Sequence, residues 1–203
     1  MRRPIPPAGR RRAAVWRVLA LAAAVVGATP AALAQAKPET LSVCAACHGP
    51  GGNSVIPQFP SLAGQPKLFI ENQLVLIREG LRDIAPMKDV LAKITDEEIV
   101  ELAKHYAAQP LLPTPGTAQA AKLQRGAQLS AKNLCGTCHL PSFAGQSQVP
   151  RLAGQREDYL LVTMKQLRDK PGPGRDTIMA STLRGMSDAD LGSLAHYLAL
   201  FKP

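Results

Sequence analysis

The fold is decided by two short stretches, Cys44-Ala-Ala-Cys47-His48 and Cys135-Gly-Thr-Cys138-His139, which together contain every cysteine of this 203-residue chain. Each has the spacing C-x-x-C-H, the attachment site of a c-type haem. The two thiols bond to the vinyl groups along one edge of the porphyrin, and the adjacent imidazole reaches the iron. Because two matches leave no cysteine over, the sequence predicts two covalently bound haem c groups. Their attachment residues are Cys44, Cys47 and His48, and Cys135, Cys138 and His139.

Other uses of these cysteines explain the pattern less well. A thiol–disulfide redox pair expects one C-x-x-C near a βαβ pattern and does not explain why His follows both pairs. A zinc site could use Cys and His, but the two pairs lie 91 residues apart, far outside zinc-finger spacing. Two structural disulfides in an exported protein are a further alternative.

The N-terminus predicts export. Residues 1–17 hold six Arg and no acid, residues 18–28 are apolar, and Ala32-Leu33-Ala34 is an A-x-A cleavage signal. We therefore expect residues 1–34 to be a cleaved signal peptide and the mature protein to lie in the periplasm; an uncleaved membrane anchor is the alternative.

The full chain has a formal net charge of +9, but beyond residue 34 only 18 basic and 15 acidic residues remain. This near-balance gives no basis for nucleic-acid binding.

The rest of the chain consists of two repeats of one sequence unit. Pro60-Ser-Leu-Ala-Gly-Gln65 recurs 90 positions later as Pro150-Arg-Leu-Ala-Gly-Gln155. We therefore predict a first domain at 35–109, a proline-rich linker at 110–117 and a second domain at 118–203. Residues 35–115 have a formal charge of −2 and residues 116–203 of +5. The two halves could therefore face different partners.

Both units read as helical, and no segment shows convincing strand alternation, so the predicted class is all-α. We expect helices at 68–78 and 159–168, and a helix at 118–133 leading into the second haem motif. Thr95-Asp-Glu-Glu98 has the form of a capping box before a final helix, and Ser187-Asp-Ala-Asp190 repeats it. Each unit is small for a self-sufficient core, so a haem is expected to supply its apolar centre.

The methionines suggest the second axial ligand of each iron. Met87 and Met179 each lie nine residues before the aspartate that opens the last helix, and no other methionines match between the units. They are the predicted partners of His48 and His139, whereas Met164 and Met186 are expected in the core. The two remaining histidines, His105 and His196, are read as surface or partly packed helix residues.

The order C-x-x-C-H, P-x-L-A-G-Q, helix, Met and capped final helix resembles class I cytochrome c, and the doubled form resembles the diheme cytochrome c-four family. The resemblance spans about residues 38–201. It implies two tandem class I cytochrome c domains and electron shuttling in the bacterial periplasm, often to a terminal oxidase. It also implies that the Pro60 and Pro150 carbonyls accept the Nδ1–H of the proximal histidines, although both could be plain turn prolines. Leu140-Pro141 departs from the family, which has glycine after His.

The expected function is therefore a periplasmic one-electron carrier per haem in a respiratory chain, not an enzyme. Its partners would be an electron-donor complex and a terminal oxidase or reductase. One alternative is a cytochrome subunit of a membrane-bound dehydrogenase or oxidase complex, associated with the membrane through that complex. Another is a diheme peroxidase, which needs one haem with an open sixth position; the matched pair Met87 and Met179 argues against it.

Overall fold

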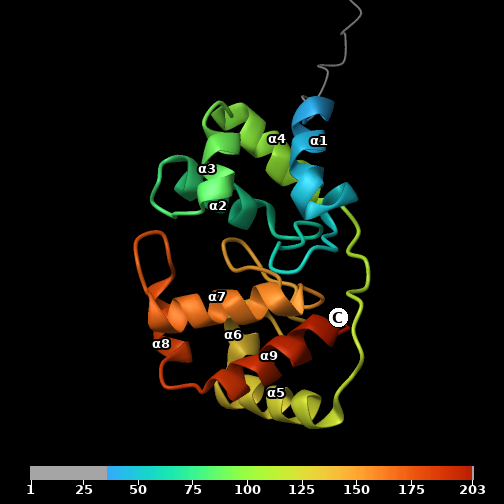
Figure 1. The fold of residues 1–203 in the computed structure, drawn as a ribbon, viewed down its shortest axis with the longest axis vertical. Helices are drawn as coiled ribbons and strands as arrows, with labels where there is room; N and C mark the ends of the chain where they lie inside the picture. Colours follow the sequence, from blue (N-terminus) through green and yellow to red (C-terminus); the bar gives the residue numbers. More distant parts are fainter. Residues whose placement is uncertain (1–35, 203) are drawn as a thin grey trace, which may run out of the picture. The chain divides into compact units, whose positions relative to one another are not determined.

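The computed structural model describes residues 36–202, so the predicted signal peptide lies outside the described residues. Those residues are helical, as predicted, and their only β-type pairing is an isolated bridge between Gln146 and Val149. No helix within 36–202 is long and apolar enough to cross a membrane. Figure 1 shows the helices in two groups. They are α1 (Pro38–His48), α2 (Lys67–Arg78), α3 (Ala85–Leu91) and α4 (Asp96–Ala107), then α5 (Ala120–Lys132), α6 (Cys135–His139), α7 (Glu157–Asp169), α8 (Thr177–Leu183) and α9 (Asp188–Leu200).

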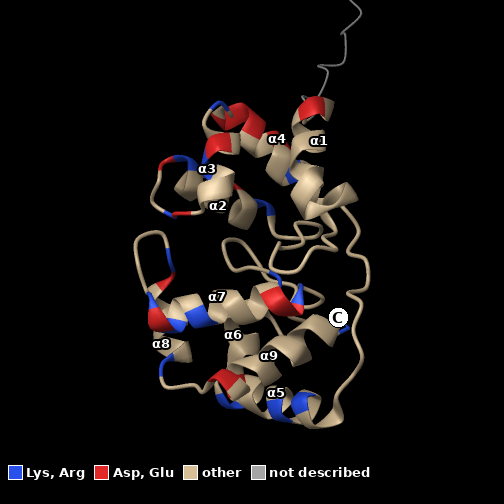
Figure 2. Ribbon diagram, viewed as in Figure 1, with Lys and Arg blue, Asp and Glu red and all other residues tan. Residues whose placement is uncertain are grey.

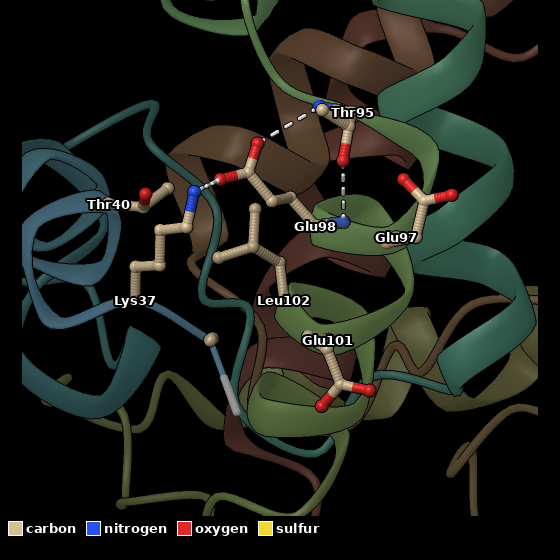
Figure 3. Close-up of a pocket in the computed structure, with 8 residues that line it drawn as sticks. Lys37, Thr40, Thr95, Glu97, Glu98, Glu101 and Leu102 are labelled. Carbon is tan, nitrogen blue, oxygen red and sulfur yellow. Dashed lines mark hydrogen bonds and ion pairs between the residues drawn. The ribbon is translucent and has the colours of Figure 1, made fainter. Parts of the chain in front are cut away.

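In the first domain, α1 to α4, the first haem motif forms the C-terminal end of α1. The final helix α4 begins at the predicted capping box, where the Thr95 side chain accepts from Glu98 N–H and the Glu98 carboxylate accepts from Thr95 N–H. Glu98 also pairs with Lys37 at 2.5 Å, which joins the start of α1 to the start of α4. Figure 3 shows these contacts beside a pocket of about 270 Å³, which no predicted haem residue lines.

In the second domain, α5 to α9, the second haem motif is a separate short helix. The chain breaks after α5 at Leu134, which adopts φ +54°, and α6 then contains the whole C-x-x-C-H stretch. The final helix α9 begins at Ser187, whose hydroxyl accepts from Asp190 N–H as expected from the repeat. Helices α5 and α9 cross closely at Gly126, where a Cβ atom would lie 2.3 Å from the Ser193 carbonyl oxygen.

The apolar cores of the two domains differ in size. In the first domain the buried cluster consists of Ile70, Leu102, Ala103 and Tyr106. In the second domain it has eleven members: Leu129, Phe143, Ala153, Leu160, Met164, Leu183, Leu191, Leu194, Ala195, Leu198 and Ala199. Met186 packs half-buried against this second cluster, so Met164 and Met186 are core residues, as expected.

Candidate haem sites

The imidazoles of both haem motifs are buried and held in one orientation. His48 Nδ1 lies 2.9 Å from the Pro60 carbonyl oxygen, and His139 Nδ1 lies 2.8 Å from that of Pro150. These hydrogen bonds confirm the expected role of the two prolines. They place the proton on Nδ1 and leave Nε2 with a lone pair that can bind a metal. Burial lowers the pKa of both imidazoles, which favours the neutral form that binds a metal.

The cysteines lie beside these histidines on the same short helical turns. None of the four forms a disulfide, and Cys138 is exposed while the other three are half-buried. Burial raises the pKa of the Cys44 and Cys135 thiols. Among the described residues, no group of three or more His, Cys, Asp or Glu side chains is arranged to hold a metal ion. The disulfide and zinc alternatives therefore gain no support from the structure.

The P-x-L-A-G-Q motif positions each haem site through its backbone. In the first domain Leu62 and Ala63 donate to the Gly52 carbonyl, at 2.7 and 3.1 Å, and Gly64 donates to Tyr106 of α4. The motif thereby ties the loop after the haem motif to the final helix.

The second domain makes the same three backbone hydrogen bonds at the equivalent residues. Leu152 and Ala153 donate to the Phe143 carbonyl at 2.9 and 3.1 Å, and Gly154 donates to Leu198 of α9 at 3.0 Å. Because the backbone makes these bonds, they survive the exchange of Gly52 for Phe143 between the two copies.

Met87 and Met179 occupy equivalent places. Each is the third residue of a seven-residue helix, α3 and α8 respectively, and both side chains are half-buried. The Met179 N–H donates to the Asp176 carboxylate, which caps α8. The repeat in sequence is therefore also a repeat in local structure.

The two remaining histidines differ from each other. His105 is half-buried, as expected, but the prediction for His196 was wrong, because its side chain is only 2% exposed. Its Nδ1 lies 2.9 Å from a Glu157 carboxylate oxygen, and its Nε2 accepts from Gln119 N–H at 3.0 Å. Both ring nitrogens are engaged, so this imidazole links α9 to α7 and to the residue before α5. Its place in a helix that is apolar on nearly all sides could have revealed this burial.

Sequence reasoning also missed a set of contacts between the two domains. Gln65 Nε2 donates to the Arg151 carbonyl and its Oε1 accepts from Arg151 N–H, at 3.1 and 2.9 Å. Gln155 makes the same two bonds to the backbone of Ser61, at 2.9 and 2.7 Å. The Arg151 guanidinium also crosses the boundary and donates to the Ala63 carbonyl at 3.0 Å. The sequence shows that the glutamine is repeated, but it does not indicate which residue of the other domain the glutamine contacts.

Arg151 also bears on whether the site fits a haem. Its side chain is buried, Nε has no hydrogen-bond partner among the described residues, and burial lowers the pKa of its guanidinium to about 10. A buried cation without an anion is costly. Haem carries two propionates, so a bound haem would bring anions of the kind that this residue lacks. The residues present thus fit the group: paired thiols, an oriented neutral imidazole and an unmatched buried cation.

Two oriented histidines, two cysteine pairs and two matching helical domains define a diheme c-type cytochrome, a carrier of electrons. The comparisons with known proteins agree. Residues 30–105 match the family model described as cytochrome c oxidase, cbb3-type, subunit III, and residues 123–200 match that described as cytochrome c. The cytochrome c4 of Pseudomonas aeruginosa is 32% identical over 177 residues, which cover 83% of this chain and 87% of the relative. The chain belongs to the cytochrome c4 family, and it carries two covalently bound haem c groups.

Two further likenesses are informative. A thiosulfate dehydrogenase electron acceptor of Thiomonas intermedia is 32% identical over 197 residues, covering 90% of each chain. The crystal structure of reduced recombinant cytochrome c4 from Pseudomonas stutzeri matches with a TM-score of 0.74 at 27% identity. It covers 81% of this chain and 96% of that one. The fold is therefore that of two tandem class I cytochrome c domains, as predicted.

Proposed function

We propose that this protein carries electrons in the periplasm, one per haem, from a donor complex of a respiratory chain to a terminal oxidase or reductase. In this proposal residues 1–34 are a cleaved signal peptide, and the domains lie at 35–109 and 118–203 around a linker at 110–117. Each haem iron supplies reversible one-electron chemistry when bound. The chain's own residues attach the group, orient the imidazole and exclude water from it.

We assign the first haem to Cys44, Cys47, His48 and Met87, and the second to Cys135, Cys138, His139 and Met179. The observation that carries this assignment is the matched position of the two methionines, each third in an equivalent seven-residue helix. A His/Met pair fills both axial positions of an iron and raises its potential relative to a bis-His pair. Such an iron exchanges electrons and has no open position for a substrate, which argues against a diheme peroxidase.

The assignment is tested by Met87→Ala and Met179→Ala. Because each substitution removes one of two His/Met sites, each should remove roughly half of the Met–iron charge-transfer absorption of the ferric protein. Met164→Ala is the control: this methionine is buried in the core and should leave that absorption intact. An unchanged spectrum in either of the first two variants would show that another residue is the ligand. Mass spectrometry of the purified protein would give the cleavage site and the number of attached haems together.

A second candidate function is that of electron acceptor for a particular partner enzyme. The Thiomonas intermedia relative favours it, since its name gives it this role toward thiosulfate dehydrogenase. The charges on the two domains also fit docking to more than one partner. Acidic side chains gather on α4, at Asp96, Glu97, Glu98 and Glu101, and basic side chains on α5, at Lys122, Arg125 and Lys132 (Figure 2). Reduction by a thiosulfate dehydrogenase in stopped flow, faster than by a respiratory donor, would favour this candidate.

A further inference from the structure

One peptide group in each domain is hydrogen-bonded at both ends, to its own proximal histidine and to the other domain. In the first domain the Pro60 carbonyl accepts from His48 Nδ1 at 2.9 Å. The N–H of the same peptide group, on Ser61, donates to Gln155 Oε1 of the second domain at 2.7 Å. An unbroken path therefore runs from the first imidazole, through a single peptide bond, to a side chain of the other domain.

The second domain contains the same path in the reverse sense. His139 Nδ1 lies 2.8 Å from the Pro150 carbonyl, and the N–H of that peptide group, on Arg151, donates to Gln65 Oε1 of the first domain at 2.9 Å. Gln155 Oε1 also accepts from Arg156 N–H at 2.9 Å, which fixes its position from its own domain. Each glutamine is thus connected, through one peptide group and two hydrogen bonds, to the proximal imidazole of the opposite domain and not to that of its own domain.

These contacts are buried, so water does not weaken them. Gln65 is 4% exposed and Gln155 2%, and the residues that they contact, Ser61 and Arg151, are 4% and 5% exposed. Hydrogen bonds in such surroundings polarise one another along a chain. An acceptor at the N–H end of a peptide group makes the carbonyl end of that group more negative. The carbonyl then becomes a stronger acceptor for the imidazole N–H.

We propose that Gln65 and Gln155 are positioning residues that set the reduction potential of the haem in the opposite domain. The proposal rests on His48 and His139 being the proximal ligands. A stronger Nδ1–H hydrogen bond makes an imidazole more basic and favours ferric iron, so each glutamine lowers the potential of the haem across the boundary. By linkage, oxidation of one haem strengthens the bond to the other domain, so the contact between domains responds to redox state.

The test uses the holoprotein with Gln155→Met, which keeps the length of the side chain and removes the amide. The potential of each haem is followed by NMR of its haem methyl groups during a redox titration. The potential of the first haem should rise while that of the second stays near its parent value. In the ferrous protein the His48 Nδ1–H resonance should move to lower chemical shift. Gln65→Met should give the mirror result, with the second haem and His139 affected.

Two further variants complete the test. Thr114→Val removes a linker hydrogen bond to the Gly154 carbonyl without touching either amide, and should move neither potential. Gln155→Glu at acidic pH, where its carboxyl is neutral, keeps an acceptor toward Ser61 and should restore the parent value for the first haem; it also serves if Gln155→Met does not fold. A shift of the glutamine's own haem, or no shift of the opposite haem in correctly folded Gln155→Met or Gln65→Met, would overturn the proposal. Failure of the ligand assignment would instead show as an unchanged Met–iron charge-transfer absorption in Met87→Ala or Met179→Ala.

Discussion

At the scale of single residues, the residue directly after each haem motif has the same backbone conformation in both domains but a different side chain. Gly49 has φ +77° and ψ 163°, and Leu140 has φ +68° and ψ 156° in the equivalent place. This region of φ and ψ is reached easily only by glycine. The next turn is also the same, since the Gly52 N–H donates to the Gly49 carbonyl and the Phe143 N–H to the Leu140 carbonyl, each at 2.9 Å. The loops differ only after it, where in the second domain the Gly145 N–H donates back to the His139 carbonyl. The second haem motif therefore keeps the backbone conformation of the first although leucine replaces glycine.

Gly49→Ala should destabilise the first domain strongly. A Cβ at this position would lie 2.1 Å from the Asn53 carbonyl oxygen, and the residue would also be strained at positive φ. We expect a loss of about 2–4 kcal/mol in the free energy of unfolding, measured with guanidinium chloride. Leu140→Gly is the matched control: it relieves strain but loses apolar burial and raises the entropy of the unfolded chain, so its effect should stay within about 1 kcal/mol. Similar values for the two variants would contradict this reasoning.

At the scale of secondary structure, the contact between α5 and α9 depends on a glycine inside a helix. A Cβ at Gly126 would lie 2.3 Å from the Ser193 carbonyl oxygen and 2.4 Å from Tyr197 Cβ. Gly126→Ala should therefore cost about 2 kcal/mol of stability, because separating the helices outweighs the better helix propensity of alanine. Gly192→Ala in α9, where a Cβ would meet nothing within 4 Å, should instead stabilise by about 0.5–1 kcal/mol. Thermal unfolding of both variants measures the difference, and a stabilised Gly126→Ala would show that the helices do not cross so closely.

The sequence predicts these helices well because their signals are local. The capping box at Thr95, the N-cap at Ser187 and the apolar spacing behind them lie within one or two turns of chain. It predicts contacts between distant residues poorly. Gln65 and Gln155 are visible as repeated letters, but nothing near either one indicates a partner in the other domain. The burial of His196 was missed because it depends on residues that are distant in the sequence, Glu157 of α7 and Gln119 just before α5.

At the scale of the whole molecule, the two domains differ in how much core they possess without haem. Four residues form the connected buried cluster of the first domain and eleven that of the second. Ala63, Ile77, Leu91 and Ile99 of the first domain are also buried but lie outside its cluster. The second also gains an aromatic group in which Phe143 meets Tyr197 and Phe201 edge-on, with ring centroids 6.0 and 4.7 Å apart. The equivalent position in the first domain is Gly52, beside which Tyr106 of α4 fills the space. We therefore expect the first domain to depend more heavily on its haem as an apolar centre.

Loss of one haem should consequently affect the two domains unequally. Replacing Cys44 and Cys47 by Ser should abolish most of the helical signal of α1 to α4, since the remaining cluster is too small to hold them. The same change at Cys135 and Cys138 should leave part of α5, α7 and α9 folded around their larger cluster. Far-UV circular dichroism of each variant, with its haem count established by mass spectrometry, gives the comparison. The chain lacking both haems should lose most of its helix, with only this part of α5, α7 and α9 remaining. A greater loss of helix from the second pair of substitutions than from the first would mean that the size of the apolar cluster does not control the stability of the haem-free domains.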